Sequence, residues 1–576
     1  MKKIFPILDW ILKYKPEYFK NDLVAGITVA ILLIPQGMAY ALIAGLPPVY
    51  GLYAALTPQI VYTIMGTSRQ LAVGPVAMDS LLVAAGLGAL SINDLGEYIQ
   101  MAILLSLIVG IIHLILGIFK MGFFVSFLSK PVISGFTSGA ALIISLSQVK
   151  HLTGIPITQN NKLQDFIYSI LKSEIPIHFT TLLLGLCCIF FLLFIKKLNK
   201  KIPSALVVVF FSTLWVYYFD KNLEGVAIIG KIPQGLPSIK FPKLDWIVIK
   251  NLFPIALTIS IVAFTEAISI SKGLAEKNKL YNLNPNQELL ALGSANIFGS
   301  FFQSYPTTGG FSRTAVNSQA KAKTGVASLI CALLIALTLS FFTDLFFYVP
   351  KTVLAAIIIS AVLRLINIKY AIRLYKSRKD EFAVLVLTFI LTLFVGIIQG
   401  IFFGIILSLL LLVYRASKPH FAFLGRIGNT NYFQNIDRFP NEVVVREDLI
   451  ILKFDAQLFF GNIDFFKKLV FNSIEKKPSK VKGFIINARA INYIDSTASE
   501  ELIIIIKKLQ KKGIRVMIVG AIDPSRDIII NSKLIKVIKK QNLFVTSGDA
   551  TDSFDGKAKK NTALQKKLSR QYNQKN

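Results

Sequence analysis

The sequence predicts an α-helical polytopic membrane protein followed by a small cytosolic α/β domain. Three observations predict this fold class: an apolar composition, about fourteen apolar stretches of spanning length, and alternating strand and helix patterns after Lys418. Of the 576 residues, 54% are hydrophobic and 16% are charged, and the mean hydropathy is +0.60. A soluble chain carries about 25% charged residues. The composition therefore excludes a disordered chain, a fibrous repeat and an ordinary cytosolic enzyme.

The charge balance is strongly basic, with 63 Lys and Arg against 32 Asp and Glu. An excess of this sign is typical of nucleic-acid-binding proteins. Membrane proteins, however, also gather Lys and Arg in short cytoplasmic loops. The sequence contains no nucleic-acid-binding motif, no metal-ligand spacing and no pair of nucleophile and base. We therefore expect no nucleic-acid partner, no metal, no cofactor and no enzymatic activity.

Apolar stretches of about 17–25 residues mark helices that can cross a ~30 Å hydrocarbon core. Ten stretches are clear and four are weaker. The clear ones are 24–45, 99–118, 131–150, 178–196, 203–219, 252–271, 324–347, 350–367, 381–397 and 399–415, and the weaker ones are 50–66, 75–90, 288–302 and 310–320.

Loop charges test this count of fourteen spans. The basic clusters within 196–201 and 369–379 then fall on the same side as both termini. The positive-inside rule places that side in the cytoplasm. Residues 1–20 are basic and amphipathic without a cleavable apolar region, so they predict a cytosolic arm before a transport domain at 21–418.

The last third of the chain changes character after a linker at 419–440. Residues 441–546 predict an α/β domain with a largely parallel sheet. Its expected strands at 443–455, 481–488 and 514–521 alternate with helices at 462–474, 496–513 and 526–538. Residues 547–576 are polar, and we expect them to be a disordered tail.

Two interrupted apolar segments predict an anion site inside the membrane. Gly74-Pro75 interrupts the first, and a helix beginning at Pro75 would direct its free N–H groups into the membrane interior. Pro306 and Gly309-Gly310 precede a second short helix that carries Arg313 near its start. Interruptions at corresponding places in two halves indicate a transporter's binding site and an inverted repeat of seven plus seven spans. The alternative is that both segments are turns between spans.

Three ionisable residues lie within apolar segments: Asp79 and Arg313 in the two interrupted ones and Glu266 in the span at 252–271. A charge at the centre of a membrane helix costs about 2.5–3.5 kcal/mol. Arg313 can balance the charge of an anion. Glu266 and Asp79 would repel an anion unless each were protonated or held a cation, and this conflict predicts symport with H⁺ or Na⁺. The alternative for each acid is a structural hydrogen bond to a neighbouring helix.

Several segments match motifs that occur together in one known family. They are PVYGLYAA at 48–55 with Tyr62 and GTSR at 66–69, GPVA at 74–77, GGFSRTAVN at 309–317 and INYIDSTASEEL at 491–502. The first group resembles the sulfate permease signature of the SulP family of anion transporters. The next two segments resemble that family's half-helix entries, and the last resembles its STAS domain. The resemblance extends from Asn21 to about Leu543.

The resemblance implies a core of spans one to four and eight to eleven, a gate, elevator-type motion and a homodimer. It places the anion beside Gln36, Val76, Ala77, Gly310, Phe311, Ser312 and Arg313. In related bicarbonate carriers an acid at the position of Glu266 helps to hold sodium, with a hydroxyl residue one turn later. Ile270 occupies that later position here, which favours proton coupling. Asp79 is not part of the family pattern.

The resemblance also implies a regulatory phosphosite at Ser496 or Thr497 and an unidentified protein partner of the STAS domain. The alternative for these two residues is helix capping. The favoured function is uptake of a small inorganic anion, above all sulfate, across an inner or plasma membrane. Bicarbonate or a dicarboxylate such as fumarate is the alternative substrate. A membrane anion sensor that signals through the STAS domain is the alternative of another class.

Overall fold

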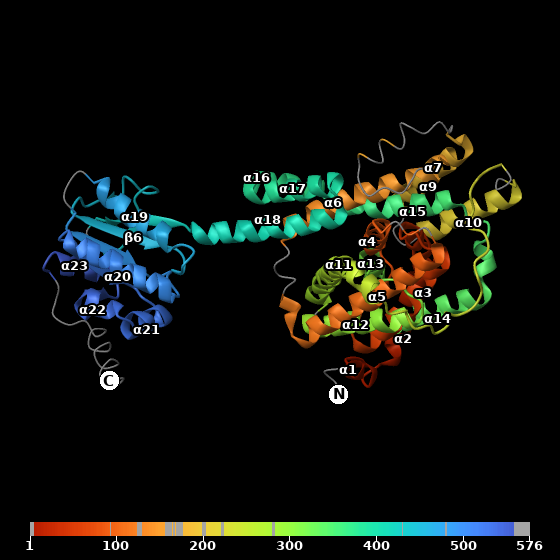
Figure 1. Ribbon diagram of the computed structural model, residues 1–576, viewed down its shortest axis with the longest axis horizontal. Helices are drawn as coiled ribbons and strands as arrows, with labels where there is room; N and C mark the ends of the chain where they lie inside the picture. The colour runs from red at the N-terminus through yellow and green to blue at the C-terminus, as the bar shows by residue number, and fades with distance from the viewer. Residues whose placement is uncertain are drawn as a thin grey trace. The chain divides into compact units, whose positions relative to one another are not determined.

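The structure is a computed structural model that describes residues 5–90, 92, 94–123, 129–155, 164, 168, 177–198, 203–220, 224–278, 283–428, 430–477 and 481–557. The chain forms two compact units, Met1–Ser408 and Leu409–Asn576. Each unit is described by itself below (Figure 1).

Fourteen principal helices run from Pro16 to Ser417 in the described part of the chain. The first seven are α2 (Pro16–Ile43), α3 (Pro48–Met65), α4 (Ala77–Gly88), α5 (Leu95–Ile118), α6 (Lys130–Ser147), α9 (Phe179–Leu198) and α10 (Ser204–Tyr218). The second seven are α11 (Trp246–Asn278), α12 (Pro285–Phe301), α13 (Phe311–Gln319), α14 (Val326–Phe341), α15 (Lys351–Val362), α17 (Lys379–Phe394) and α18 (Ile397–Ser417). The shorter elements are α1 (Ile7–Ile11), α7 (Val149–Thr153), α16 (Ile368–Ser377) and the 3₁₀ turns η2 (Thr343–Phe346) and η3 (Leu363–Leu365).

The helices of the first unit pack in two groups. The core group consists of α2–α5 and α11–α14, which pack against one another. The gate group consists of α6, α9, α10, α15 and α17. Six of the described helices are long and apolar enough to cross a membrane, and four shorter ones are also apolar. The predicted division into core and gate is confirmed.

Small residues allow close approach inside the core group. A Cβ atom on Gly51 of α3 would lie 1.9 Å from the carbonyl oxygen of Gly37 on α2. A Cβ atom on Gly293 of α12 would lie 2.9 Å from the carbonyl oxygen of Gly110 on α5. Gly51 belongs to the signature-like segment 48–55, so the glycine in that motif has a packing reason.

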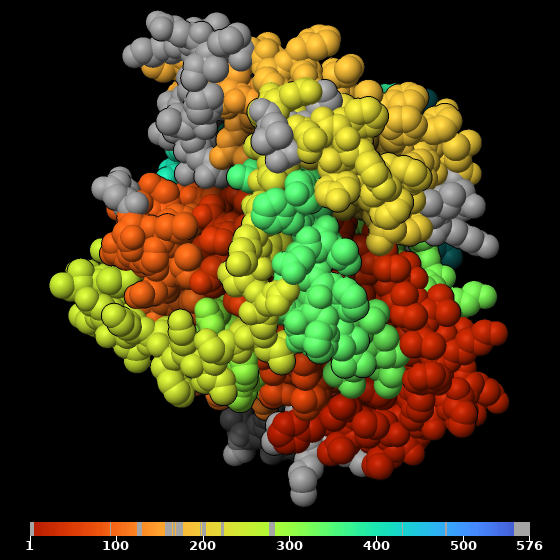
Figure 2. All heavy atoms as spheres, turned by 90° about the vertical axis from the view of Figure 1, so that its right-hand side faces the viewer, coloured from red at the N-terminus to blue at the C-terminus, as the bar shows by residue number. Residues whose placement is uncertain are grey.

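An extended segment at 224–245 crosses the surface of the first unit. Its backbone bonds to residues before α15, with Ile229 N donating to Val349 O at 2.9 Å and Gly235 N donating to Leu339 O at 2.9 Å. Figure 2 shows this yellow segment beside the green residues that it bonds.

The second unit is an α/β domain built on a seven-stranded sheet in the order β4-β3-β6-β7-β8-β9, with β5 paired to β3. The strands are β3 (Phe421–Ile427), β4 (Phe433–Asn435), β5 (Val443–Val444), β6 (Leu449–Phe454), β7 (Gly483–Asn487), β8 (Arg515–Val519) and β9 (Leu543–Phe544). The helices are α19 (Ile463–Glu475), α20 (Ser496–Lys511), α21 (Asp523–Asn531), α22 (Leu534–Ile538) and α23 (Ser547–Phe554). Strands β6 to β9 are parallel, as predicted, and β3 is antiparallel to β6. Helices α19, α20 and α22 contribute to the core on one face, and α23 covers part of the other.

Two predicted boundaries of this domain were wrong. The expected linker at 419–440 contains β3 and β4, because β3 supplies an antiparallel edge to the sheet. The expected disordered tail begins with the ordered helix α23, and its remainder at 558–576 lies outside the described residues. The polar composition of this segment favoured a prediction of disorder. A capping box between Thr546 and Asp549 marks the start of α23 in the structure.

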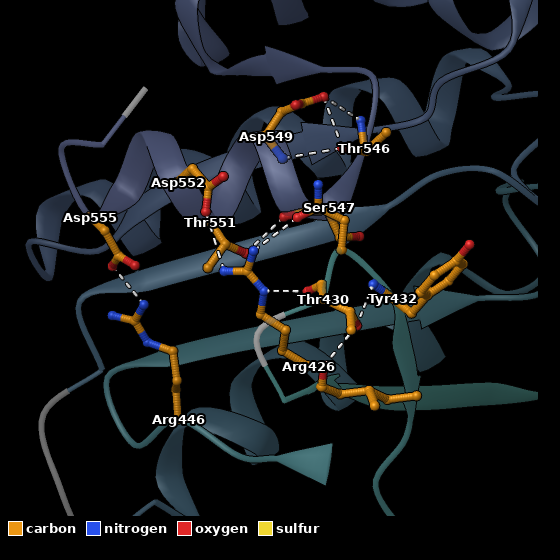
Figure 3. A network of polar contacts seen from close by, with 12 residues as sticks. Arg426, Thr430, Tyr432, Arg446, Thr546, Ser547, Asp549, Thr551, Asp552 and Asp555 are labelled. Carbon is orange, nitrogen blue, oxygen red and sulfur yellow. Dashed lines mark hydrogen bonds and ion pairs between the residues drawn. The ribbon is translucent and has the colours of Figure 1, made fainter. Parts of the chain in front are cut away.

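Ion pairs hold α23 against the sheet (Figure 3). Arg446 Nη1 contacts Asp555 at 2.5 Å, and Arg426 Nη1 contacts Asp552 at 3.2 Å. Ala550 of α23 is fully buried against the sheet. The domain therefore extends beyond residue 546.

Candidate functional site

The two interrupted segments meet inside the core group. Strand β1 (Val73–Gly74) pairs antiparallel with β2 (Thr308–Gly309), and Val73 lies opposite Gly309. Gly310 N donates to Ala72 O at 3.0 Å. All of these residues are buried, so the alternative that the two segments are turns between spans is wrong.

Each strand leads directly into a short helix. Helix α4 has 12 residues and follows the extended Val76, and α13 has 9 residues and follows the extended Gly310. Within the described chain, no side chain caps either helix. The first N–H groups of both helices therefore remain as donors, and such helix tips favour anions.

Helix α4 begins two residues later than the sequence predicts. Pro75 does not start the helix, because its carbonyl belongs to the strand region and accepts a hydrogen bond from Arg313. Ser80 N donates to Val76 O at 3.0 Å in the first helical bond. The tip of α4 is therefore formed by Ala77, Met78 and Asp79.

The side chain of Arg313, on α13, forms hydrogen bonds to the backbone that leads into α4. Its side chain is only 1% exposed. Nη1 donates to Pro75 O at 2.7 Å, and Nη2 lies 3.5 Å from Ala72 O. A Cβ atom on Gly310 would lie 2.5 Å from the guanidinium carbon, so the glycine leaves room for this side chain. Arg313 thus places positive charge beside the tips while it bonds to the backbone that leads into α4.

A pocket of about 180 Å³ opens between the core and gate groups beside both tips. Met78 and Phe311 from the two tips and Glu266 of α11 contribute to its wall. The remaining lining residues are Val132, Ile133, Phe136, Thr137, Val262, Thr265, Ser269, Ile270, Leu365 and Ile401. The lining is mostly apolar, and its polar side chains are Glu266 and the hydroxyl residues Thr137, Thr265 and Ser269.

Some of the predicted site residues line this pocket and others do not. Phe311 and Glu266 line it. The other predicted substrate residues are not among its lining side chains, and these are Gln36, Val76, Ala77, Gly310, Ser312 and Arg313. Of these six, Ser312 is exposed and the rest are buried.

Asp79 belongs to the first turn of α4 and is fully buried. Neither of its carboxylate oxygens has a hydrogen-bond partner in the part of the chain that the structure describes. The alternative of a structural hydrogen bond therefore has no support for Asp79. An ionised carboxylate without a partner is costly to bury, so a proton or a cation would stabilise Asp79.

Sequence reasoning missed a buried carboxylate that holds the chain leading into α4. Glu288 of α12 accepts hydrogen bonds from Tyr62 OH at 2.6 Å, Thr67 N at 2.7 Å and Thr67 Oγ1 at 2.6 Å. Ser68 N also donates to it at 3.2 Å. Tyr62, Thr67 and Ser68 all belong to the signature-like motif. The motif therefore donates hydrogen bonds to Glu288, an acid from the other half of the transport unit.

Asp22 of α2 holds the chain that follows α13 in the same way. It accepts hydrogen bonds from Lys323 N at 2.7 Å, Thr324 N at 3.2 Å and Thr324 Oγ1 at 2.6 Å. Each half of the transport unit thus supplies an acid that fixes the half-helix segment of the other half. The only sequence signal was an isolated acid near the start of an apolar span.

Gln70 connects these two regions. The side-chain Nε2 of Gln70 donates to Ala322 O at 2.6 Å, and the backbone carbonyl oxygen of Gln70 accepts from Asn317 Nδ2 at 2.9 Å. Within the described ranges, no three His, Cys, Asp or Glu side chains are grouped to hold a metal ion.

The predicted phosphosite lies at the start of α20. Ser496 and Thr497 are exposed there. The capping bond comes from Asp495, whose side chain accepts from Ala498 N at 2.7 Å. Capping by Asp495 leaves the two neighbouring hydroxyl groups accessible.

Comparisons with known proteins agree with this architecture. The model of the sulfate permease family matches residues 19–388, and the STAS domain model matches residues 441–550. Sulfate transporter 4.1, chloroplastic, from Arabidopsis thaliana is 36% identical over 95% of this chain and 82% of its own length. High affinity sulfate transporter 2 from Stylosanthes hamata is 32% identical over 97% of this chain and 87% of its own length.

Solved structures share the fold. Murine Solute Carrier 26 family member A9, an anion transporter in the inward-facing state, matches with a TM-score of 0.87 and 24% identity over 96% of this chain and 94% of that one. The transmembrane domain of a cyanobacterium bicarbonate transporter, BicA, matches with a TM-score of 0.58 and 20% identity over 69% of this chain and 98% of that one. The relatives are transporters and not enzymes. The chain belongs to the sulfate permease family, as a multi-pass membrane anion transporter with a C-terminal STAS domain.

Proposed function

We propose that this protein takes up sulfate by symport with a cation, and that the proton is the favoured cation. The observation that carries the proposal is the convergence of two uncapped helix tips on one pocket between core and gate. Elevator-type movement of the core group against the gate group would carry the bound anion across the membrane. The printed names of several plant relatives describe sulfate transporters, which supports sulfate as the substrate.

Glu266 supplies the coupling in this proposal. Its side chain lines the pocket, where an ionised carboxylate opposes anion entry. A proton on Glu266 removes that repulsion, so anion and proton bind together. Ile270, one turn later, has no side-chain oxygen to bind sodium, which supports the proton, and the hydroxyl of the neighbouring Ser269, which also lines the pocket, is the position at which a sodium ligand would be tested.

Uptake of labelled sulfate into proteoliposomes tests this function. We expect accumulation above the outside concentration when a pH gradient is imposed and little dependence on a sodium gradient. Competition by unlabelled bicarbonate, fumarate and chloride measures substrate choice. Sulfate uptake absent under every gradient would contradict the proposal, and binding without accumulation would favour an anion sensor.

The proposal places the protein in an inner or plasma membrane with both termini in the cytoplasm. The basic clusters at 196–201 and 369–379 support this orientation. It also includes a homodimer and a protein partner of the STAS domain, with Ser496 and Thr497 as the accessible modification site. Labelling of single cysteines introduced at exposed loop positions from one side of the membrane tests the orientation.

A further inference from the structure

Helix α16 has an exposed apolar row and a basic row that the anion site does not use. Ile368, Ile372 and Tyr375 are 63%, 53% and 55% exposed. Their spacing places them on one side of the helix. Lys369, Arg373 and Lys376 are also exposed, and the same spacing places them on a neighbouring side. Arg378 and Lys379 extend the positive charge, and Asp380 and Glu381 follow at the start of α17, so that 368–381 holds five cations and two acids.

Helix α16 packs on the helix that follows it, α17. Leu374 of α16 is buried, and the ring of Tyr375, at one end of the exposed apolar row, meets that of Phe382 edge-on with centroids 5.2 Å apart. Figure 1 shows α16 next to α17. The exposed rows therefore belong to a short helix that leads directly into α17 of the transport unit.

Helix α16 also lies next in the chain to residues that form the gate-side wall of the anion pocket, which consists of Val132, Ile133, Phe136 and Thr137 of α6 with Leu365 of η3. Leu365 of η3 lines the pocket and lies three residues before the start of α16. Asn367 caps α16 by accepting a hydrogen bond from Tyr370 N at 3.0 Å. Lys130 Nζ of α6 lies 5.0 Å from the centroid of the Tyr370 ring. Val132 and Ile133, which follow Lys130 on α6, line the same pocket.

We propose that α16 is a binding surface for anionic phospholipid headgroups, and that lipid bound there sets the position of the pocket's gate-side wall. A helix with an apolar row beside a basic row lies in the membrane interface, with its apolar side among acyl chains and its cations at the phosphates. The exposed apolar row of Ile368 and Ile372 beside the cations, on a helix continuous with α17 of the transport unit, favours a lipid over an acidic protein, because acyl chains would cover that row. The regulatory half of this proposal rests on the proposed function.

The first experiment compares uptake in vesicles of phosphatidylcholine alone with uptake in vesicles that also hold about 20 mol% phosphatidylglycerol. We expect the anionic lipid to raise initial uptake by the parent protein about fivefold or more. The triple variant Lys369→Gln, Arg373→Gln, Lys376→Gln should lose that response.

The matched control is Lys231→Gln, Lys240→Gln, Lys243→Gln. It removes the same number of exposed positive charges from the extended segment 224–245 and should keep the response. A parent protein that ignores lipid charge would overturn the proposal. So would a triple variant that is impaired equally in both lipids, because that result indicates steering of the free anion.

A second measurement does not require transport. In a background in which the native Trp10, Trp215 and Trp246 are replaced by phenylalanine, Ile372→Trp places a single fluorophore on the apolar row of α16. Its emission should be quenched more by brominated phosphatidylglycerol than by brominated phosphatidylcholine, and the Gln triple change should abolish the difference. Equal quenching would overturn the lipid surface even if sulfate uptake is active. Selective quenching without any sulfate uptake would contradict the proposed function and leave the surface intact.

Discussion

Arg313 shows how a single side chain can serve the site without lining it. The sequence identified it as a charge for the anion, and the structure shows it bonded to the backbone that leads into α4. The sequence could not predict this, because the partner carbonyls lie more than two hundred residues away. Removing the side chain would leave a buried carbonyl unpaired, which costs about 1–3 kcal/mol.

We expect Arg313→Ala to raise the KM for sulfate at least about tenfold, equivalent to ~1.4 kcal/mol of binding free energy. Arg313→Lys should fall between the parent and Arg313→Ala, because it keeps the charge without the planar pair of donors. Initial uptake rates over a range of sulfate concentrations measure the effect. A KM unchanged in both variants would remove Arg313 from the site.

Glu266 and Asp79 differ in what surrounds them. Glu266 faces the pocket, whereas Asp79 is enclosed without a hydrogen-bond partner in the described structure. We expect Glu266→Gln to retain sulfate binding but to lose the dependence of uptake on the coupling gradient. Glu97→Gln, at an exposed acid in the first turn of α5, is the control and should leave the dependence intact. Gradient-driven accumulation by the Glu266 variant would move the coupling role elsewhere.

We predict that Glu288 positions α4 through its hydrogen bonds to Thr67 and Ser68, which precede that helix in the chain. Glu288→Ala deprives two backbone N–H groups and two hydroxyls of their acceptor, so the tip of α4 should shift and the KM should rise about tenfold. Glu288→Gln keeps one oxygen acceptor and should recover part of the affinity. The control Asp94→Ala removes the exposed cap of α5 and should leave the KM unchanged. A loss of maximal rate with no change in KM would contradict a positioning role.

Among the elements, spanning helices and half-helices were the most predictable, because apolar length and the Gly-Pro and Gly-Gly interruptions are local signals. The start of α4 was less predictable, since pairing of β1 with β2 extends the chain through Pro75. The expected single helix at 526–538 is divided into α21 and α22. Ser532 is extended there, and its Oγ accepts from Leu534 N at 3.2 Å. Serine at such a break competes with the helix through a local hydrogen bond.

The contact between α2 and α3 makes a direct prediction about stability. Gly51→Ala would force its Cβ against Gly37 O, and overpacking of this kind costs about 1–3 kcal/mol. We expect a lower thermal midpoint in detergent. Gly273→Ala on α11 is the matched control, because no atom lies within 4 Å of its added Cβ. That control should be neutral or stabilising by about 0.5–1 kcal/mol.

The ion pair between Arg446 and Asp448, just before β6, predicts a pH dependence in the STAS domain. The hydrogen bond and charge of Arg446 lower the pKa of Asp448 below its ordinary value. A lowered pKa contributes stability above the ordinary pKa of about 4, and this stability is lost as the pH falls through the lowered value. The ion pair is partly exposed, so its contribution is small, about 0.2–1 kcal/mol.

We therefore expect Arg446→Gln to lower the Tm of the STAS transition in calorimetry of the full chain at about pH 7. The difference from the parent should shrink as the pH falls through the lowered pKa of Asp448, because below that value the carboxyl is protonated in both the folded and the unfolded state. A difference that grows as the pH falls would contradict this account.

At the scale of the whole molecule, the interruptions that occur third in each set of seven spans predicted the repeat, and the resemblance to a known family implied the division into core and gate. It did not predict how the halves hold each other. Asp22 and Glu288 each bind the chain beside the other half's half-helix, and these pairings join residues more than two hundred positions apart. Only the folded chain reveals such crossed contacts.

The central claim is that the two helix tips form one anion site. A structure determined with selenate in place of sulfate tests it most directly, because anomalous scattering from selenium locates the anion. We predict a single strong peak with selenate oxygens about 3 Å from N–H groups in the first turns of α4 and α13, beside Met78 and Phe311. A peak elsewhere in the transport unit, with none between those tips, would contradict the account.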